Sequence, residues 1–173
     1  DQMEQLVDRT VKKHGAKVKF LNFRECLERL TQNLLAGQPL RDSDGADGGV
    51  RLLDVNHDGY LDVVIGNARM RRTRVWMPRE AKWLETSLPG DIVQGRDVAG
   101  PVDAGVRFGV LSDNGNASFI VRNERIAGGW YFDDEKWVED KTLLTGLEID
   151  ERPLFTSRAS RDQGIRLRDL DND

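Results

Sequence analysis

Oxygen-bearing side chains recur at a regular spacing in the segment LDVNHDGYLDVVIGN, residues 53–67. Positions 1, 3, 5 and 9 of this loop are Asp54, Asn56, Asp58 and Asp62. Gly59 at position 6 permits a sharp turn, and the main-chain carbonyl of Tyr60 at position 7 supplies a further oxygen. Oxygen ligands in this order are typical of a calcium loop, so the sequence predicts Ca²⁺ bound by these residues.

The flanks of this loop are typical of strands. An EF-hand needs a bidentate Glu at position 12 and a helix on each side, but position 12 here is Ile65. The segments VRLLDV and YLDVVIG on either side are rich in apolar and β-branched residues. We therefore expect the loop to join two strands of a sheet. A polar hairpin turn that binds no ion is the alternative.

The loop resembles that of FG-GAP (VCBS, integrin alpha-like) repeats, whose order is Asp-x-Asp/Asn-x-Asp-Gly-x-x-Asp. The resemblance implies that the loop lies between strands of a β-propeller blade. It also implies a structural role for the calcium ion.

A degenerate copy of the loop follows 56 residues later, where Gly59 aligns with Gly115 and Asn67 with Asn123. The four ligand positions become Val110, Ser112, Asn114 and Ser118. Since the carboxylates are lost, we expect this copy to bind calcium very weakly or not at all. A third copy begins at RDLDND, which adds three candidate calcium ligands: Asp169, Asp171 and Asp173.

Paired tryptophans also recur, at an offset of 54 residues: Trp76 aligns with Trp130, and Trp83 with Trp137. A two-residue deletion in the second copy explains the smaller offset. We expect the first Trp of each pair in the third strand of a blade, the second in the fourth strand, and both in the packing of one blade on the next. A carbohydrate-stacking surface is the alternative.

The predicted fold is therefore mainly β, a partial propeller of four-stranded antiparallel blades with a short α-helical N-terminal segment. The expected parts are a helical segment and linker (1–48), a blade with the calcium loop (49–104), a degenerate blade (105–165) and the start of a third repeat (166–173). The expected strands are 50–55, 60–65, 106–111 and 117–122, with one further strand through each Trp. Too few blades are present to close a ring, so we expect other domains, blades or a second copy as partners.

Two helices are expected in the N-terminal segment. One is an apolar stripe from Met3 to Val11 that ends at Gly15, followed by an extended piece over 16–20. The other runs from Phe23 to Leu35, with Asn22 as a possible cap and Gly37 as its stop. Cys26 on this helix is expected to pack, with a reactive thiol as the minor alternative.

Several polar groups are expected to lie in solvent. These are the polar linker 41–49 with Asp42, Asp44 and Asp47, the acidic turn 133–135, and both histidines, His14 and His57. Four arginines, Arg69, Arg71, Arg72 and Arg74, are expected at a solvated strand edge or an interdomain contact. Binding of phosphate or polysaccharide by these arginines is the alternative.

Composition and the absence of known motifs argue against several classes of function. A net charge of −4 with interspersed charges gives no general attraction to nucleic acid, and no apolar run approaches the ~20 residues of a membrane span. A single cysteine forms no internal disulfide, and no haem or zinc motif is present. No convergent nucleophile or acid–base group stands at a recognisable spacing, so no catalytic residue is predicted.

The chain as a whole resembles the FG-GAP region of large secreted proteins of planctomycetes and verrucomicrobia, on GAKVKFLNFRECLERLTQNLLAGQPLRD, GVRLLDVNHDGYLDVVIGN and IRLRDLDND. In such proteins the propeller accompanies dehydrogenase-like and cytochrome domains. The expected function is a calcium-stabilised, non-catalytic scaffold or interaction module of a larger secreted or periplasmic protein, with a possible protein or glycan ligand. The alternatives are an accessory part of a secreted oxidoreductase and a carbohydrate-binding module.

Overall fold

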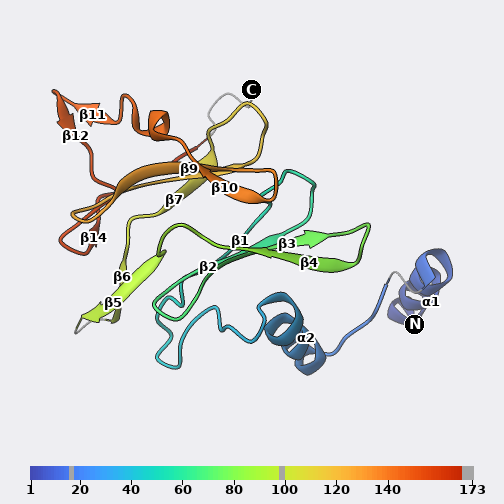
Figure 1. Ribbon diagram of the computed structural model, residues 1–173. Helices are drawn as coiled ribbons and strands as arrows, with labels where there is room; N and C mark the ends of the chain where they lie inside the picture. The colour runs from blue at the N-terminus through green and yellow to red at the C-terminus, as the bar shows by residue number, and fades with distance from the viewer. Residues whose placement is uncertain (16–17, 98–99, 169–173) are drawn as a thin grey trace. The chain divides into compact units, whose positions relative to one another are not determined.

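The computed structural model describes residues 1–15, 18–97 and 100–168 and is mainly β, with antiparallel sheets and a short helical N-terminal part (Figure 1). It comprises two units, Asp1–Gln38 and Pro39–Asp173. Within the described ranges, no helix has the length and apolar character needed to cross a membrane.

Both predicted helices are present in the first unit. Helix α1 (Gln2–His14) begins at Asp1, whose side chain accepts from the Met3 N–H at 3.0 Å, and basic residues occupy its last turn. Helix α2 (Phe23–Arg29) has the predicted Asn22 cap, completed as a capping box by Glu25. Residues 16 and 17 of the predicted extended piece lie outside the described ranges.

Helix α2 continues into a π-helical turn, η2 (Leu30–Leu34), which the apolar stripe does not distinguish from α-helix. The N–H of Gly37 donates to the Thr31 carbonyl at 2.7 Å, and Gly37 has a φ of 77°. Both features are typical of a glycine that ends a helix, as predicted. The prediction for Cys26 was wrong, because its thiol is exposed.

The first sheet contains the predicted loop and has the order β1-β2-β3-β4. Its strands are β1 (Val50–Leu53), β2 (Asp62–Gly66), β3 (Arg71–Met77) and β4 (Lys82–Thr86). All neighbours are antiparallel, with Val50 opposite Ile65 and Val64 opposite Thr73. All five residues of β2 are buried, as expected for a strand covered on both faces.

The second sheet repeats this order as β7-β8-β9-β10. Its strands are β7 (Arg107–Val110), β8 (Ala117–Arg122), β9 (Ala127–Asp133) and β10 (Lys136–Glu139). Both first tryptophans lie in the third strands and both second tryptophans in the fourth strands, as predicted.

The predicted alignment of Trp76 with Trp130 was wrong. Trp76 lies opposite Trp83 across β3 and β4, whereas Phe132, not Trp130, lies opposite Trp137 across β9 and β10. Trp76 therefore corresponds to Phe132, and the two-residue deletion falls in the turn between the third and fourth strands. The second sheet closes this turn tightly with the exposed residues Asp134 and Glu135, at φ values of 46° and 66°.

An apolar core joins the two sheets. Phe119 of β8 stacks on Trp130 at 4.9 Å and meets Trp137 edge-on at 5.0 Å between ring centroids. The indole N–H of Trp137 donates to the Thr73 hydroxyl of β3 at 2.7 Å, and both groups are buried. These ring contacts lie within the second sheet, and Trp130 and Trp137 also belong to the core shared with the first sheet. Trp76 is only partly buried.

Short elements precede and follow the second sheet. They are β5 (Val93–Asp97), β6 (Gly100–Asp103), η3 (Lys141–Leu144), β11 (Glu148–Ile149), β12 (Arg152–Pro153), β13 (Ser157–Arg158) and β14 (Arg161–Asp162). They form the pairs β5–β6, β11–β12 and β13–β14.

The arginines of β3 do not lie at a solvated strand edge, because β3 pairs with β2 on one side and β4 on the other. Arg71 forms an ion pair with Asp91 at 2.7 Å. Arg72 and Arg74 both pair with Glu85 of β4, at 2.8 and 3.1 Å, and Arg74 is buried. Cross-strand charge pairing thus explains Arg72 and Arg74, and Arg71 pairs with a residue that precedes β5.

The segment 41–49 is also more ordered than the predicted solvated linker. Arg41 and Asp47 form an isolated antiparallel bridge, and the Asp42 carboxylate accepts from the N–H groups of Asp44 and Ala46 at 3.0 and 2.9 Å. This turn belongs to the same unit as the two sheets.

The buried bond between the sheets gives a first prediction. Thr73→Val removes the acceptor of the Trp137 N–H while keeping the side-chain shape, so the free energy of unfolding should fall by about 1–3 kcal/mol. Urea unfolding measures this change. Thr86→Val on the neighbouring strand is the control, and an equal loss in both variants would contradict the role of the bond.

Candidate metal centre

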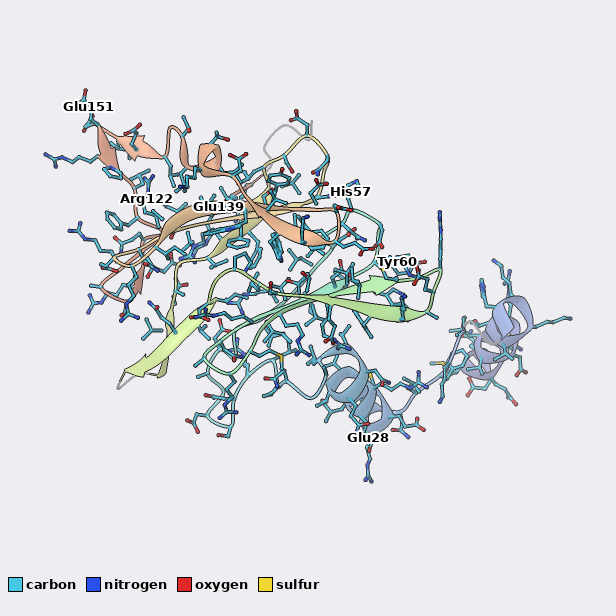
Figure 2. All side chains as sticks on the ribbon, in the orientation of Figure 1. Glu28, His57, Tyr60, Arg122, Glu139 and Glu151 are labelled. Carbon is cyan, nitrogen blue, oxygen red and sulfur yellow. The ribbon has the colours of Figure 1, made fainter. Side chains whose placement is uncertain are left out.

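The predicted calcium loop lies between β1 and β2, and its own aspartates stabilise its turn by accepting main-chain hydrogen bonds. The Asp54 carboxylate accepts from the N–H groups of Asp58 and Gly59 at 3.1 and 2.7 Å. The Asp58 carboxylate accepts from the Tyr60 N–H at 2.9 Å. Positive φ values of 57° at His57 and 84° at Gly59 give the sharp turn that position 6 requires. Figure 2 labels His57 and Tyr60 on this loop.

Asn56 carries an acceptor that no described residue binds. Its amide Nδ2 donates to Asp58 Oδ2 at 3.1 Å. Its Oδ1 is buried and has no hydrogen-bond partner within the described chain. A buried acceptor left unsatisfied costs about 1–3 kcal/mol, which a bound water or ion would relieve. A hard cation would satisfy this oxygen, and the residues therefore fit the ion that the sequence predicts.

Asp62 at position 9 is fully buried and holds the loop to the sheet. The Val55 N–H donates to its Oδ2 at 2.9 Å, and the Trp76 N–H of β3 donates to its Oδ1 at 2.7 Å. The pKa of Asp62 is raised to about 6, because burial, together with the charges of Asp58 and Asp54, outweighs the two main-chain hydrogen bonds that lower it. The ionised form of Asp62 is thus destabilised, and a cation bound nearby would stabilise it.

The carboxylates are not gathered around one point. Among the described residues, no group of three or more His, Cys, Asp or Glu side chains is arranged to hold a metal ion. The aspartates of the loop instead accept from main-chain N–H groups, although each carboxylate oxygen has a second lone pair. The structure thus brings Asp54, Asn56 and Asp58 into one hydrogen-bonded turn, with Asp62 on its buried side.

The degenerate loop keeps the same turn without the carboxylates. Asn114 Oδ1 accepts from the Asn116 N–H at 3.0 Å and from the Ser112 hydroxyl at 2.7 Å. The Leu111 N–H donates to the buried Ser118 hydroxyl at 3.3 Å, as the Val55 N–H does to Asp62. Position 9 therefore has a structural task in both loops, which reasoning from ligand spacing missed.

The first loop also contacts the second sheet. The Val55 carbonyl accepts from the Ala117 N–H, the first residue of β8, at 3.0 Å. The ring of His57 lies beside Gly115, where an added Cβ would approach the ring to 3.3 Å. His57 and His14 are both exposed, as predicted. The candidate ligands Asp169, Asp171 and Asp173 lie outside the described residues.

The pKa of Asp62 gives a second prediction. Between its ordinary pKa of 3.8 and its folded pKa of about 6, the folded chain binds more protons than the unfolded chain. In calcium-free buffer, stability should therefore fall as the pH rises from about 4 to 6, by at most ~3 kcal/mol. Asp47 and Asp162 have a lowered pKa, so their contribution to the stability of the fold is lost only at lower pH, where they become protonated.

Urea unfolding with EDTA at several pH values between 4 and 7 measures this slope. The matched variant is Asp62→Ser, which installs the residue of the degenerate loop and keeps an acceptor for the Val55 N–H. It should lose the slope between pH 4 and 6. An unchanged slope in Asp62→Ser would contradict the assignment.

The loop is an oxygen-rich turn that is hydrogen-bonded to both sheets. Comparisons with protein-family models, curated proteins and solved structures found no match to this chain.

Proposed function

We propose that this chain is a calcium-binding, non-catalytic propeller segment of the FG-GAP type, which serves as a scaffold or interaction module in a larger exported protein. The observation that carries the proposal is the buried Asn56 Oδ1, which has no hydrogen-bond partner among the described residues and lies in a turn stabilised by aspartates. The proposed ligands are Asp54, Asn56, Asp58, the Tyr60 carbonyl and Asp62.

Calcium would act by linkage. An ion that binds only the folded loop stabilises the fold by RT ln(1 + [L]/Kd), about 2.7 kcal/mol when calcium is 100 times Kd. The charges of Asp54 and Asp58 disfavour ionised Asp62 in the free loop, and a cation would turn this repulsion into attraction. The bound loop would also hold both sheets, through Trp76 on one side and Ala117 on the other.

The two sheets support the scaffold role. They share one strand order, pack through one apolar core and have matching loops after their first strands. Four-stranded antiparallel sheets packed face to face are the units of a propeller, which supports the blade interpretation. Weak modular calcium sites suit millimolar calcium, so a secreted or periplasmic location is part of the proposal.

A carbohydrate-binding module is the second candidate, and the partly buried pair Trp76 and Trp83 favours it. Their ring centroids lie 5.2 Å apart, and the Arg74 guanidinium lies 4.6 Å from the Trp83 centroid. Glycan-array binding that is lost in Trp76→Ala, with folding intact, would support this function.

Calcium removal gives the third prediction. Saturating calcium should raise the Tm of the chain by roughly 5–10 °C over that in EDTA, which corresponds to about 2.7 kcal/mol. Asp58→Ala should abolish this response, because it removes one carboxylate and the cap of the Tyr60 N–H. Differential scanning calorimetry measures both transitions.

The matched control is Asn114→Ala, which removes the corresponding cap in the degenerate loop. Both variants should lose some stability in EDTA, since each loses a turn hydrogen bond. Only Asp58→Ala should lose the calcium response. Equal calcium shifts in the parent and in Asp58→Ala would refute the site.

A further inference from the structure

A cavity of about 240 Å³ lies within the second unit, between segments of the two four-stranded sheets. Its wall includes the start of β3 and the turn between β8 and β9, which both follow the second strand of a sheet. The calcium loop instead joins the first and second strands of its sheet. Because successive turns of an antiparallel sheet lie at alternate ends, the cavity lies at the opposite end of the sheets from the calcium loop.

Arg125, in the turn between β8 and β9, offers a guanidinium to this cavity. Its main-chain N–H donates to Asn123 Oδ1 at 2.8 Å, which fixes the turn. Its side chain is exposed, and no described residue forms a hydrogen bond or an ion pair with it. A guanidinium has five N–H donors in a planar fork that matches a carboxylate. Arg125 therefore gives the wall an anion-binding group that the fold itself does not use.

Arg71 and Asp91 form a fixed ion pair on the wall of the same cavity. Arg71 Nε and Nη2 donate to the two carboxylate oxygens of Asp91 at 2.7 and 2.8 Å, which leaves the Nη1 donors of Arg71 for another acceptor. Arg71 and Arg125 are cationic and Asp91 is anionic, so the described lining has one positive charge in excess. This lining favours an anion over a neutral molecule or a cation.

Much of the remaining wall is apolar. Val106 and Val121 belong to the core shared by the two sheets, and Ile126 packs against that core. Gly90 is buried, yet a Cβ added to it would meet no atom within 4 Å, so open space begins at this residue. Apolar walls with a few polar groups are typical of sites for small organic molecules. An inorganic anion would leave these walls uncovered.

We propose that this cavity binds a small organic carboxylate, whose charged group lies on Arg125 with help from Arg71. Its organic part would lie against Val106, Val121 and Ile126. The cavity is smaller than the ~300–1,000 Å³ of sites for drug-sized ligands, so the ligand would be no larger than a small metabolite. This site goes beyond the calcium-binding role and shares no residue with the proposed calcium ligands.

The fourth prediction concerns benzoate, an organic carboxylate, and benzamide, a neutral molecule of nearly the same shape. Benzoate should bind the parent chain and shift the amide resonances of Val106, Val121 and Ile126 in a saturable way. Benzamide should bind roughly tenfold more weakly or not at all, because it lacks the charge that strengthens hydrogen bonds to a guanidinium. Titration followed by ¹H–¹⁵N NMR measures both affinities.

Two variants test the two parts of the wall. Arg125→Gln should weaken benzoate binding roughly tenfold or more, since it removes the charged donor. Gly90→Val should also weaken it, because the new side chain occupies the open space, and the φ of Gly90 is not positive. The matched control is Arg69→Gln. Arg69 is exposed in the corresponding turn, where its N–H donates to Asn67 Oδ1 at 2.9 Å, but it does not line the cavity.

Arg69→Gln should bind benzoate like the parent, and circular dichroism verifies the folding of each variant. Asp58→Ala should also bind benzoate like the parent, so failure of the calcium site and failure of this inference are distinguishable. The proposal would be overturned by no saturable shift in the parent, or by equal affinity for benzamide or inorganic phosphate. Equal losses in Arg125→Gln and Arg69→Gln, or unchanged binding in Arg125→Gln, would overturn it as well.

Discussion

The buried carboxylate of Asp62 is the interaction on which the candidate site depends. One oxygen is bound by the Val55 N–H and the other by the Trp76 N–H, so a single side chain ties the loop to β3. Burying an acid without a counter-charge is costly, and burial raises its pKa accordingly. The fold keeps a destabilised charge beside an oxygen-rich turn, which is the electrostatic condition that favours a bound cation.

The same loop couples the two sheets. Val55 contributes its N–H to Asp62 and its carbonyl to the Ala117 N–H, so the start of β8 is set by the position of the loop. A second link between the sheets is the hydrogen bond from the Trp137 indole N–H to Thr73 of β3. An ion bound in the loop would therefore stabilise the packing of the second sheet on the first. This effect suits a structural ion in a scaffold.

Local patterns in the sequence were sufficient to predict both helices, the Asn22 cap, the strands of the two four-stranded sheets and the turn at Gly59. These features depend on neighbours within a few residues, which the sequence shows directly. The spacing of the loop also identified the residues of the candidate site. It could not show that Asp62 is fully buried, because its partner Trp76 is 14 residues away.

The remaining errors have the same physical origin. The alignment of Trp76 with Trp130 failed because a two-residue turn changed the register, and register depends on pairing between strands. The sequence did not reveal the partners of the β3 arginines, because Glu85 lies on the next strand and Asp91 follows it. The contact of Arg107 with Asp162 spans 55 residues and is invisible to any local pattern.

Calcium binding by the loop is the central claim, and isothermal titration calorimetry tests it most directly. The parent chain should bind calcium, and Asp54→Ala should show no binding at this loop, because it loses a ligand and the acceptor of the Asp58 and Gly59 N–H groups. Ser112→Ala, in the degenerate loop, should bind like the parent. No binding by the parent, or equal binding by Asp54→Ala, would contradict the account.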